Sequence, residues 1–139
     1  MSKSLPYTIA VDADGVLWED AYPEIGAMRT KTIEALRHAR GNGVVLILNT
    51  CRTESQLDCA IGCAYGCAGI IFDFVNENDP RRIEAFGGDC RKVSADMYLE
   101  DKAAGWPGDD ETVAKAIYEA VEMWLEARGG AAAAKGATR

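Results

Sequence analysis

The chain of 139 residues is short of histidine, of long apolar runs and of basic residues relative to acidic ones. A helix that spans a bilayer needs roughly twenty consecutive apolar residues, and no such run occurs. Residues 1–4 are not followed by the apolar segment that a signal peptide carries. We therefore expect a cytoplasmic protein with no membrane partner.

The charge balance excludes one further class of partner. Lysine and arginine total 15 against 22 acidic residues, so the net charge is −7. Nucleic-acid binding depends on clustered basic residues, and here they are scattered, so we expect no nucleic-acid track. The single histidine, His38, lies near the end of an expected helix and is interpreted as a surface residue rather than a catalyst.

The cysteines do not form the pairs that disulfide or zinc sites use. There are five, an odd number, and no export signal accompanies them, so a disulfide framework is not expected. Cys59, Cys63 and Cys67 recur every four residues and would share one face of a helix. They lack Cys-x-x-Cys spacing and have no histidine nearby. We interpret them as small buried packing residues.

The feature that points to chemistry is an apolar stretch from Thr8 that runs into Asp12, Asp14 and Gly15. The glycine allows the backbone to curl after Asp12, so both carboxylates and a backbone carbonyl can face one pocket. Asp12 could then attack phosphorus as a nucleophile, and Asp14 could act as general acid and base. Adjacent carboxylates also attract Mg²⁺. The alternative is an Asp-rich turn that merely ends a strand.

Strands and helices alternate along the rest of the chain. Apolar runs predict strands at 44–48, 69–75 and 97–99, and apolar periodicity with turn residues predicts helices at 30–40, 54–65, 80–86 and 111–128. Such alternation is typical of an α/β fold with a parallel sheet, right-handed crossovers and ligands at the carboxyl ends of the strands. We expect one domain over residues 1–128 and a frayed tail over residues 129–139.

Further polar residues follow the later strands in a recognisable order. Thr50 ends the second strand, Lys92 comes next, and Glu100 and Asp101 end the last strand. With the two aspartates of the first strand, this order resembles the haloacid dehalogenase-like (HAD) hydrolase superfamily over residues 8–102. Segments 22–26, 75–78 and 89–92 are also similar to a small capless bacterial and phage subgroup. The resemblance implies a three-layer Rossmann-like parallel sheet with helices on both faces.

The resemblance also implies a role for each motif. Asp12 would be the nucleophile and Asp14 the general acid and base. Thr50 would bind phosphate together with its neighbours Cys51 and Arg52, and Lys92 would stabilise charge. Magnesium would be held by Asp12, the backbone carbonyl of Asp14, and one or both of the acidic residues Glu100 and Asp101.

Two departures from the family pattern leave alternatives open. The acidic pair is Glu-Asp where Asp-Asp is more usual, and Lys92 lies closer to this pair than in most members. Arg52, Arg82 and Arg91 are therefore alternative partners for the phosphoryl group.

The segments available for a cap domain are short. Residues 18–29 and 76–91 are too few for a folded cap, so we expect an open site, with Trp18, Tyr22 and the 76–78 loop at its entrance or a second subunit as its lid. Trp18 is alternatively a residue of the core. The predicted function is a magnesium-dependent phosphatase that acts on a phosphorylated substrate through an aspartyl-phosphate. The alternatives are a phosphotransferase or phosphonate hydrolase, or a non-catalytic metal-binding regulatory protein.

Overall fold

The computed structural model describes the backbone of residues 5–136 and the side chains of residues 5–129. The elements follow one another as β1 (Thr8–Val11), β2 (Trp18–Ala21), β3 (Glu24–Met28), α1 (Thr30–Gly41), β4 (Val45–Leu48), α2 (Glu54–Ala68), β5 (Phe74–Val75), α3 (Pro80–Phe86), β6 (Met97–Leu99) and α4 (Asp110–Gly136). The predicted helices 30–40 and 54–65 are present and end one and three residues later than expected, and the helix 80–86 has the predicted bounds.

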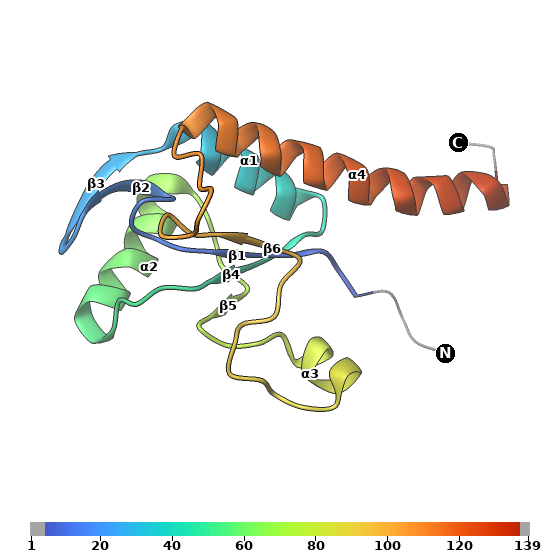
Figure 1. Ribbon diagram of the computed structural model, residues 1–139, viewed down its shortest axis with the longest axis horizontal. Coiled ribbons are helices and arrows are strands. Elements are labelled where there is room, and N and C mark those ends of the chain that lie inside the picture. Colours follow the sequence, from blue (N-terminus) through green and yellow to red (C-terminus); the bar gives the residue numbers. More distant parts are fainter. Residues whose placement is uncertain (1–4, 137–139) are drawn as a thin grey trace.

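Four of the strands form a parallel sheet in the order β5-β4-β1-β6. Ile9 of β1 lies opposite Leu46 of β4 on one side and Met97 of β6 on the other. Figure 1 shows α1 and α4 on one side of these strands and α3 on the other. This arrangement confirms the predicted α/β class with a Rossmann-like parallel sheet flanked by helices.

The two central strands are buried on both faces. Alternate residues of β1 and β4 pack with α1, α2 and α4 in a larger apolar cluster that includes Ile9, Val11, Leu46 and Leu48. The intervening residues form a smaller cluster on the other face with Val93: Ala10, Val45 and Ile47. Continuous apolar strands of this kind are expected in a parallel sheet that is covered on both faces. The carboxyl ends of β1 and β4 are therefore fixed by core packing, and they position the loops that follow them.

An aspartate at the start of α4 connects that helix to α1. One carboxylate oxygen of Asp110 accepts hydrogen bonds from the Thr32 backbone N–H at 2.8 Å and from its hydroxyl at 2.6 Å. The other oxygen accepts from the Lys31 N–H at 3.1 Å. The first N–H groups of a helix have no partner within the helix, so Asp110 caps α1 from a distant part of the chain.

The final helix is longer than the sequence predicted. It continues to Gly136 rather than ending near Arg128, which corrects both that boundary and the expected tail from Gly129. Four alanines at residues 131–134 have the highest helix propensity of any residue type. Residues 137–139 of the expected tail lie outside the described residues.

A second correction concerns residues 18–29, for which no regular structure was predicted. They form the antiparallel hairpin β2–β3, which lies beside the end of the sheet in Figure 1. Gly26 allows the two strands to approach closely, because a Cβ at this position would lie 2.0 Å from the carbonyl oxygen of Glu19. The hairpin is a two-stranded flap and not a folded cap domain.

The cysteines of α2 are not buried packing residues. Cys59 and Cys67 are exposed and Cys63 is half-buried, whereas the buried residues of this helix are alanines. The packing side of α2 is thus offset by one residue from the cysteine repeat, since Ala60, Ala64 and Ala68 have the same four-residue spacing.

In the part of the chain that the structure describes, no helix has the length and apolarity to cross a bilayer.

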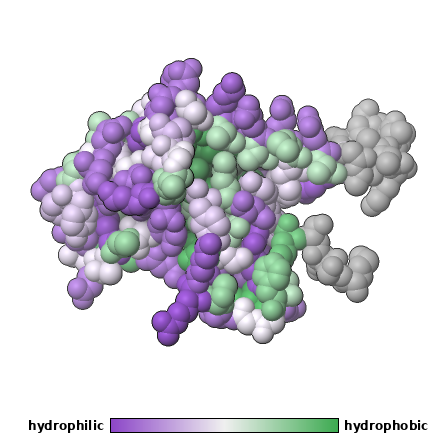
Figure 2. Space-filling view, viewed as in Figure 1, coloured by the Kyte–Doolittle hydropathy of each residue, from purple (hydrophilic) through white to green (hydrophobic). Residues whose placement is uncertain are grey.

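The visible surface is mainly hydrophilic. Figure 2 shows polar residues over most of the face seen in Figure 1, with smaller apolar patches along α4 and over α3. The exposed Met123 of α4 and Phe86 of α3 belong to these two helices.

Candidate active site

A pocket of about 350 Å³ opens at the carboxyl ends of the central strands. The N–H of Asp12 donates to the Leu99 carbonyl at 3.0 Å, and the N–H of Asn49 donates to the Val11 carbonyl at 2.8 Å, so β1, β4 and β6 end together. The pocket is lined by the loops after these strands and by the β2–β3 hairpin: Asp12, Asp14, Asp20, Tyr22, Thr50, Cys51, Arg52, Asp101 and Lys102. The topology thus gathers most of the residues that the sequence marked as candidates.

The pKa of the Asp12 carboxyl lies close to neutral pH. Burial raises its pKa to about 7; the Ala13 N–H, which donates to Oδ1 at 2.8 Å, opposes this, and the negative charges of Asp101 and Glu100 add to it. The second oxygen, Oδ2, has no such backbone donor among the contacts of the described residues. Asp12 is therefore a carboxylate whose charge is not balanced by a neighbouring cation, and a bound cation would favour its ionised form.

Asp14 has the opposite environment, although it is only two residues away. Its carboxylate receives two hydrogen bonds from Arg52, Nε to Oδ2 at 2.7 Å and Nη2 to Oδ1 at 2.8 Å. The indole N–H of Trp18 donates to Oδ1 at 3.0 Å. Burial raises the pKa of Asp14, but the hydrogen bonds from Arg52 and Trp18 outweigh this and hold the pKa below its usual value. Asp14 is ionised at neutral pH in this arrangement.

Arg52 is a structural connector rather than a free phosphate ligand. Besides Asp14, its guanidinium donates to the Glu24 carbonyl at 3.0 Å and to the carbonyl and side-chain oxygens of Gln56 at 3.4 and 3.2 Å. All five of its N–H groups are used in this way, and the residue is only 2% exposed. The ring of Tyr22 lies 4.9 Å from Cζ of Arg52. The geometry gives little support to the prediction that Arg52 binds phosphate directly, because its donors already have partners.

Asp101 is the member of the acidic pair that lies in the pocket. Its carboxylate packs against the loop that carries Asp12 and Asp14, because a Cβ on Gly15 would lie 2.2 Å from Asp101 Oδ2. Gly15 also has a positive φ of 85°, which favours glycine. Glu100 is half-buried and does not line the pocket. Of the two alternatives left open by the sequence, the geometry favours Asp101 as a direct metal ligand.

These residues fit magnesium in chemistry but do not enclose it. Among the described residues, no three side chains of His, Cys, Asp or Glu converge closely enough to hold a metal ion. The carboxylates of Asp12 and Asp101 are hard oxygen ligands in one pocket, and Mg²⁺ commonly uses one or two carboxylates while it keeps several waters. The Asp101 carboxylate lies so close to Gly15 that no side chain fits at position 15.

Thr50 and Cys51 lie in the pocket as expected. The backbone N–H of Thr50 donates to the side-chain oxygen of Asn76 at 2.8 Å, and its hydroxyl accepts from the Arg52 N–H at 3.1 Å. Asn76 follows β5 and thereby orders the Thr50 loop, a role that the sequence did not indicate. Cys51 is exposed.

Lys92 does not line the carboxylate pocket. It precedes β6, whereas Asp101 follows that strand, and the side-chain amide of Asn78, which follows β5, donates to the Lys92 carbonyl at 3.2 Å. The Lys92 ammonium lies 4.8 Å from the centre of the Tyr98 ring and does not line the pocket. The geometry gives no support to the prediction that Lys92 binds phosphate and stabilises charge, because its ammonium lies against the Tyr98 ring and not among the carboxylates.

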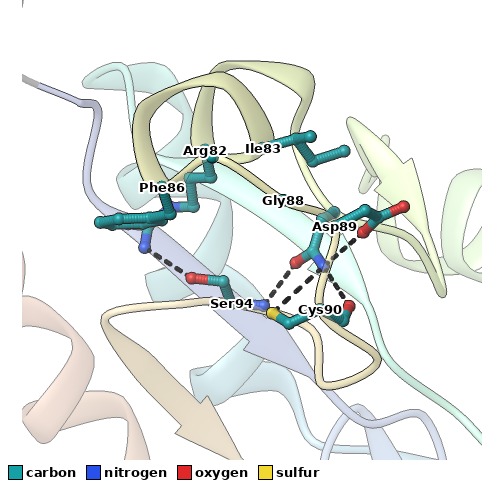
Figure 3. Close-up of a pocket in the computed structure, with 9 residues that line it drawn as sticks. Arg82, Ile83, Phe86, Gly88, Asp89, Cys90 and Ser94 are labelled. Carbon is teal, nitrogen blue, oxygen red and sulfur yellow. Dashed lines mark hydrogen bonds between the residues drawn. The ribbon is translucent and has the colours of Figure 1, made fainter.

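The two other arginines proposed in place of Lys92 are also remote from the carboxylates. Arg82 lines a separate pocket of about 400 Å³ between α3 and the loop that leads to β6, where Figure 3 shows its guanidinium turned toward Ser94. Arg91 belongs to the same loop and is exposed. The Asn78 amide donates to the carbonyl of Cys90 at 2.9 Å. Asn78 therefore fixes this loop and does not line the entrance of the carboxylate pocket.

Three residues of the hairpin and one of the last loop remain to be placed. Trp18 is fully buried, so the interpretation as a core residue is right, while Tyr22 is 58% exposed at the pocket. Asp20 and Lys102 also line it and were not predicted. The position of Lys102 directly after the acidic pair was a signal in the sequence, whereas Asp20 depends on the hairpin.

Comparison with known proteins defines the family. No protein-family model matches the chain, and no curated protein matches it either. Among solved structures, a conserved protein from Bacteroides thetaiotaomicron is 32% identical, covers 86% of this chain and 92% of its own, and has a TM-score of 0.70. The chain belongs to the family of that protein. The Bacteroides protein is described only as conserved, so the chemistry of this family member has to be argued from its own pocket.

Proposed function

We propose that the protein is a magnesium-dependent phosphatase that hydrolyses a phosphate monoester through an aspartyl-phosphate at Asp12. The observation that carries this proposal is the pair of adjacent carboxylates, Asp12 and Asp101, in one pocket at the carboxyl ends of parallel strands. Ligands of open α/β sheets bind at this edge. The resemblance of the motifs to the HAD-like hydrolases supports the same reading.

The reaction would take place in two steps. An oxygen of Asp12 attacks phosphorus, and the bond from phosphorus to the alcohol oxygen breaks. That oxygen takes a proton from Asp14 when Asp14 is protonated, or leaves as an anion when it is a weak base. Water then attacks the aspartyl-phosphate, Asp14 takes a proton from this water, and inorganic phosphate leaves with the Asp12 carboxylate restored. Magnesium, held by Asp12, Asp101 and the Asp14 carbonyl, would neutralise negative charge on the carboxylates and the phosphate.

The environment of Asp14 suits the second step better than the first. Its hydrogen bonds from Arg52 and Trp18 stabilise the ionised form, which is the form that can take a proton from water. The first step needs a proton for the leaving alcohol unless the leaving group is a weak base. We therefore expect phenyl phosphates to be hydrolysed faster than alkyl phosphates, in which the leaving oxygen needs protonation.

An activity screen tests the proposal. Wild-type protein and Asp12→Asn would be assayed with p-nitrophenyl phosphate and a panel of phosphorylated sugars and nucleotides, with magnesium or with EDTA. We expect hydrolysis by the wild type in magnesium only, and none by the variant. Activity that is equal in EDTA, or that persists in Asp12→Asn, would refute the assignment.

A further inference from the structure

The carboxylate pocket needs a positive charge that the expected lysine does not supply. Catalysis of phosphoryl transfer is mainly positioning and electrostatic stabilisation of the equatorial oxygens. Four aspartates line the pocket, and the cationic residues that line it are Arg52 and Lys102. The choice between these two follows from what each side chain already contacts.

Arg52 is not available to a substrate. Each of its N–H groups donates to an oxygen of Asp14, Glu24 or Gln56, and the side chain is almost completely buried. To reach a phosphate it would have to leave Asp14 and the hairpin, at the cost of leaving a buried charge unpaired.

Lys102 has the opposite properties. Its side chain is 82% exposed, and its ammonium lies 3.9 Å from Oδ2 of Asp101. An exposed ion pair of this kind contributes little to stability, and the flexible stem of a lysine can turn its three donors to another anion. Because Lys102 follows Asp101 in the chain, its backbone is fixed beside the carboxylate that packs against Gly15.

We infer that Lys102, rather than Lys92, is the residue that binds the phosphoryl group and neutralises its charge in the reaction. The inference rests on the proposed phosphatase function and adds to it a catalytic residue after the acidic pair. Lys102 would move from the Asp101 carboxylate to a phosphate oxygen when substrate enters.

Matched variants test this assignment. Lys102→Ala, Lys102→Arg and Lys92→Ala would be compared with the wild type in magnesium, by turnover of p-nitrophenyl phosphate and by calorimetric titration with inorganic phosphate. We expect Lys102→Ala to lose about a hundredfold in turnover, the scale of losing one electrostatic contact to the transition state, and to bind phosphate more weakly. Lys102→Arg should keep part of both, and Lys92→Ala should match the wild type.

Two outcomes would overturn the inference, and a third would separate it from the proposed function. Near-normal turnover and phosphate affinity in Lys102→Ala would refute it, as would a large loss in Lys92→Ala. A wild type that hydrolyses no ester would refute the phosphatase function. The phosphate titration would still decide the role of Lys102 in that case, since equal binding by wild type and Lys102→Ala would exclude it.

Discussion

At the scale of single residues, Asp12 serves the proposed reaction and weakens the metal-free fold. Its pKa is raised from 3.8 to about 7, mainly by burial. Between these two values the folded chain holds a proton that the unfolded chain has lost, so stability falls as the pH rises through this range. Asp12→Asn has no charge to bury. We expect the variant to be inactive and yet more stable than the wild type at pH values above about 7 in EDTA.

Thermal melts of both proteins at the two ends of the range measure this effect. Below the lower pKa, where Asp12 is protonated in both the folded and the unfolded state, the melting temperatures should be similar. A variant that is less stable than the wild type at the upper end would contradict the electrostatic account of Asp12. Saturating magnesium should reduce the difference, because the cation stabilises the wild-type carboxylate.

Substitutions of Asp14 and Asp101 should separate metal binding from proton transfer. Asp14 is held by Arg52 and Trp18 through its side chain, whereas Asp101 faces Gly15. We expect Asp14→Asn to reduce turnover while magnesium affinity changes little, and Asp101→Asn to weaken magnesium binding. Calorimetric titration of both variants with magnesium is the measurement. The reverse order of affinities would show that this division of roles is wrong.

At the scale of elements, the cap that Asp110 provides should contribute measurably to stability. Removing it leaves N–H groups of Lys31 and Thr32 without their partner. We expect Asp110→Ala to lose about 0.5–2 kcal/mol in the free energy of unfolding, the usual range for a lost helix cap. Urea unfolding checks this, with Glu111→Ala as control, since Glu111 makes only an exposed ion pair with Lys31. Equal losses in the two variants would contradict the role of the cap.

The elements also show why the sequence was only partly informative. Pro80 predicted the start of the helix 80–86, and both bounds of this helix are as predicted. The hairpin was missed because its strands are short and polar, with a burial pattern in β2 of one buried residue and three exposed ones. Its position is determined by tertiary contacts, in particular the bond from Arg52 to the Glu24 carbonyl, and local sequence does not encode these.

At the scale of the whole molecule, the order of the strands brought Asp12, Thr50 and Asp101 to one edge, as alternation of strands and helices predicts. Lys92 shows the limit of this reasoning. Motif order placed this residue before β6, but it did not reveal that the side chain lies against Tyr98 and does not line the pocket. The use of Arg52 as a clamp on Asp14 was equally hidden, because its partners come from the hairpin and from α2.

The most direct test of the central claim is the identification of the phosphorylated residue. The wild type would be incubated with magnesium and p-nitrophenyl phosphate or acetyl phosphate, and then treated with borohydride, which reduces an acyl phosphate to an alcohol. Peptide mass spectrometry would locate the change. We predict homoserine at position 12 in the wild type and no reduced residue in Asp12→Asn. Reduction at another acidic residue, or none in a protein that turns over substrate, would contradict the aspartyl-phosphate mechanism.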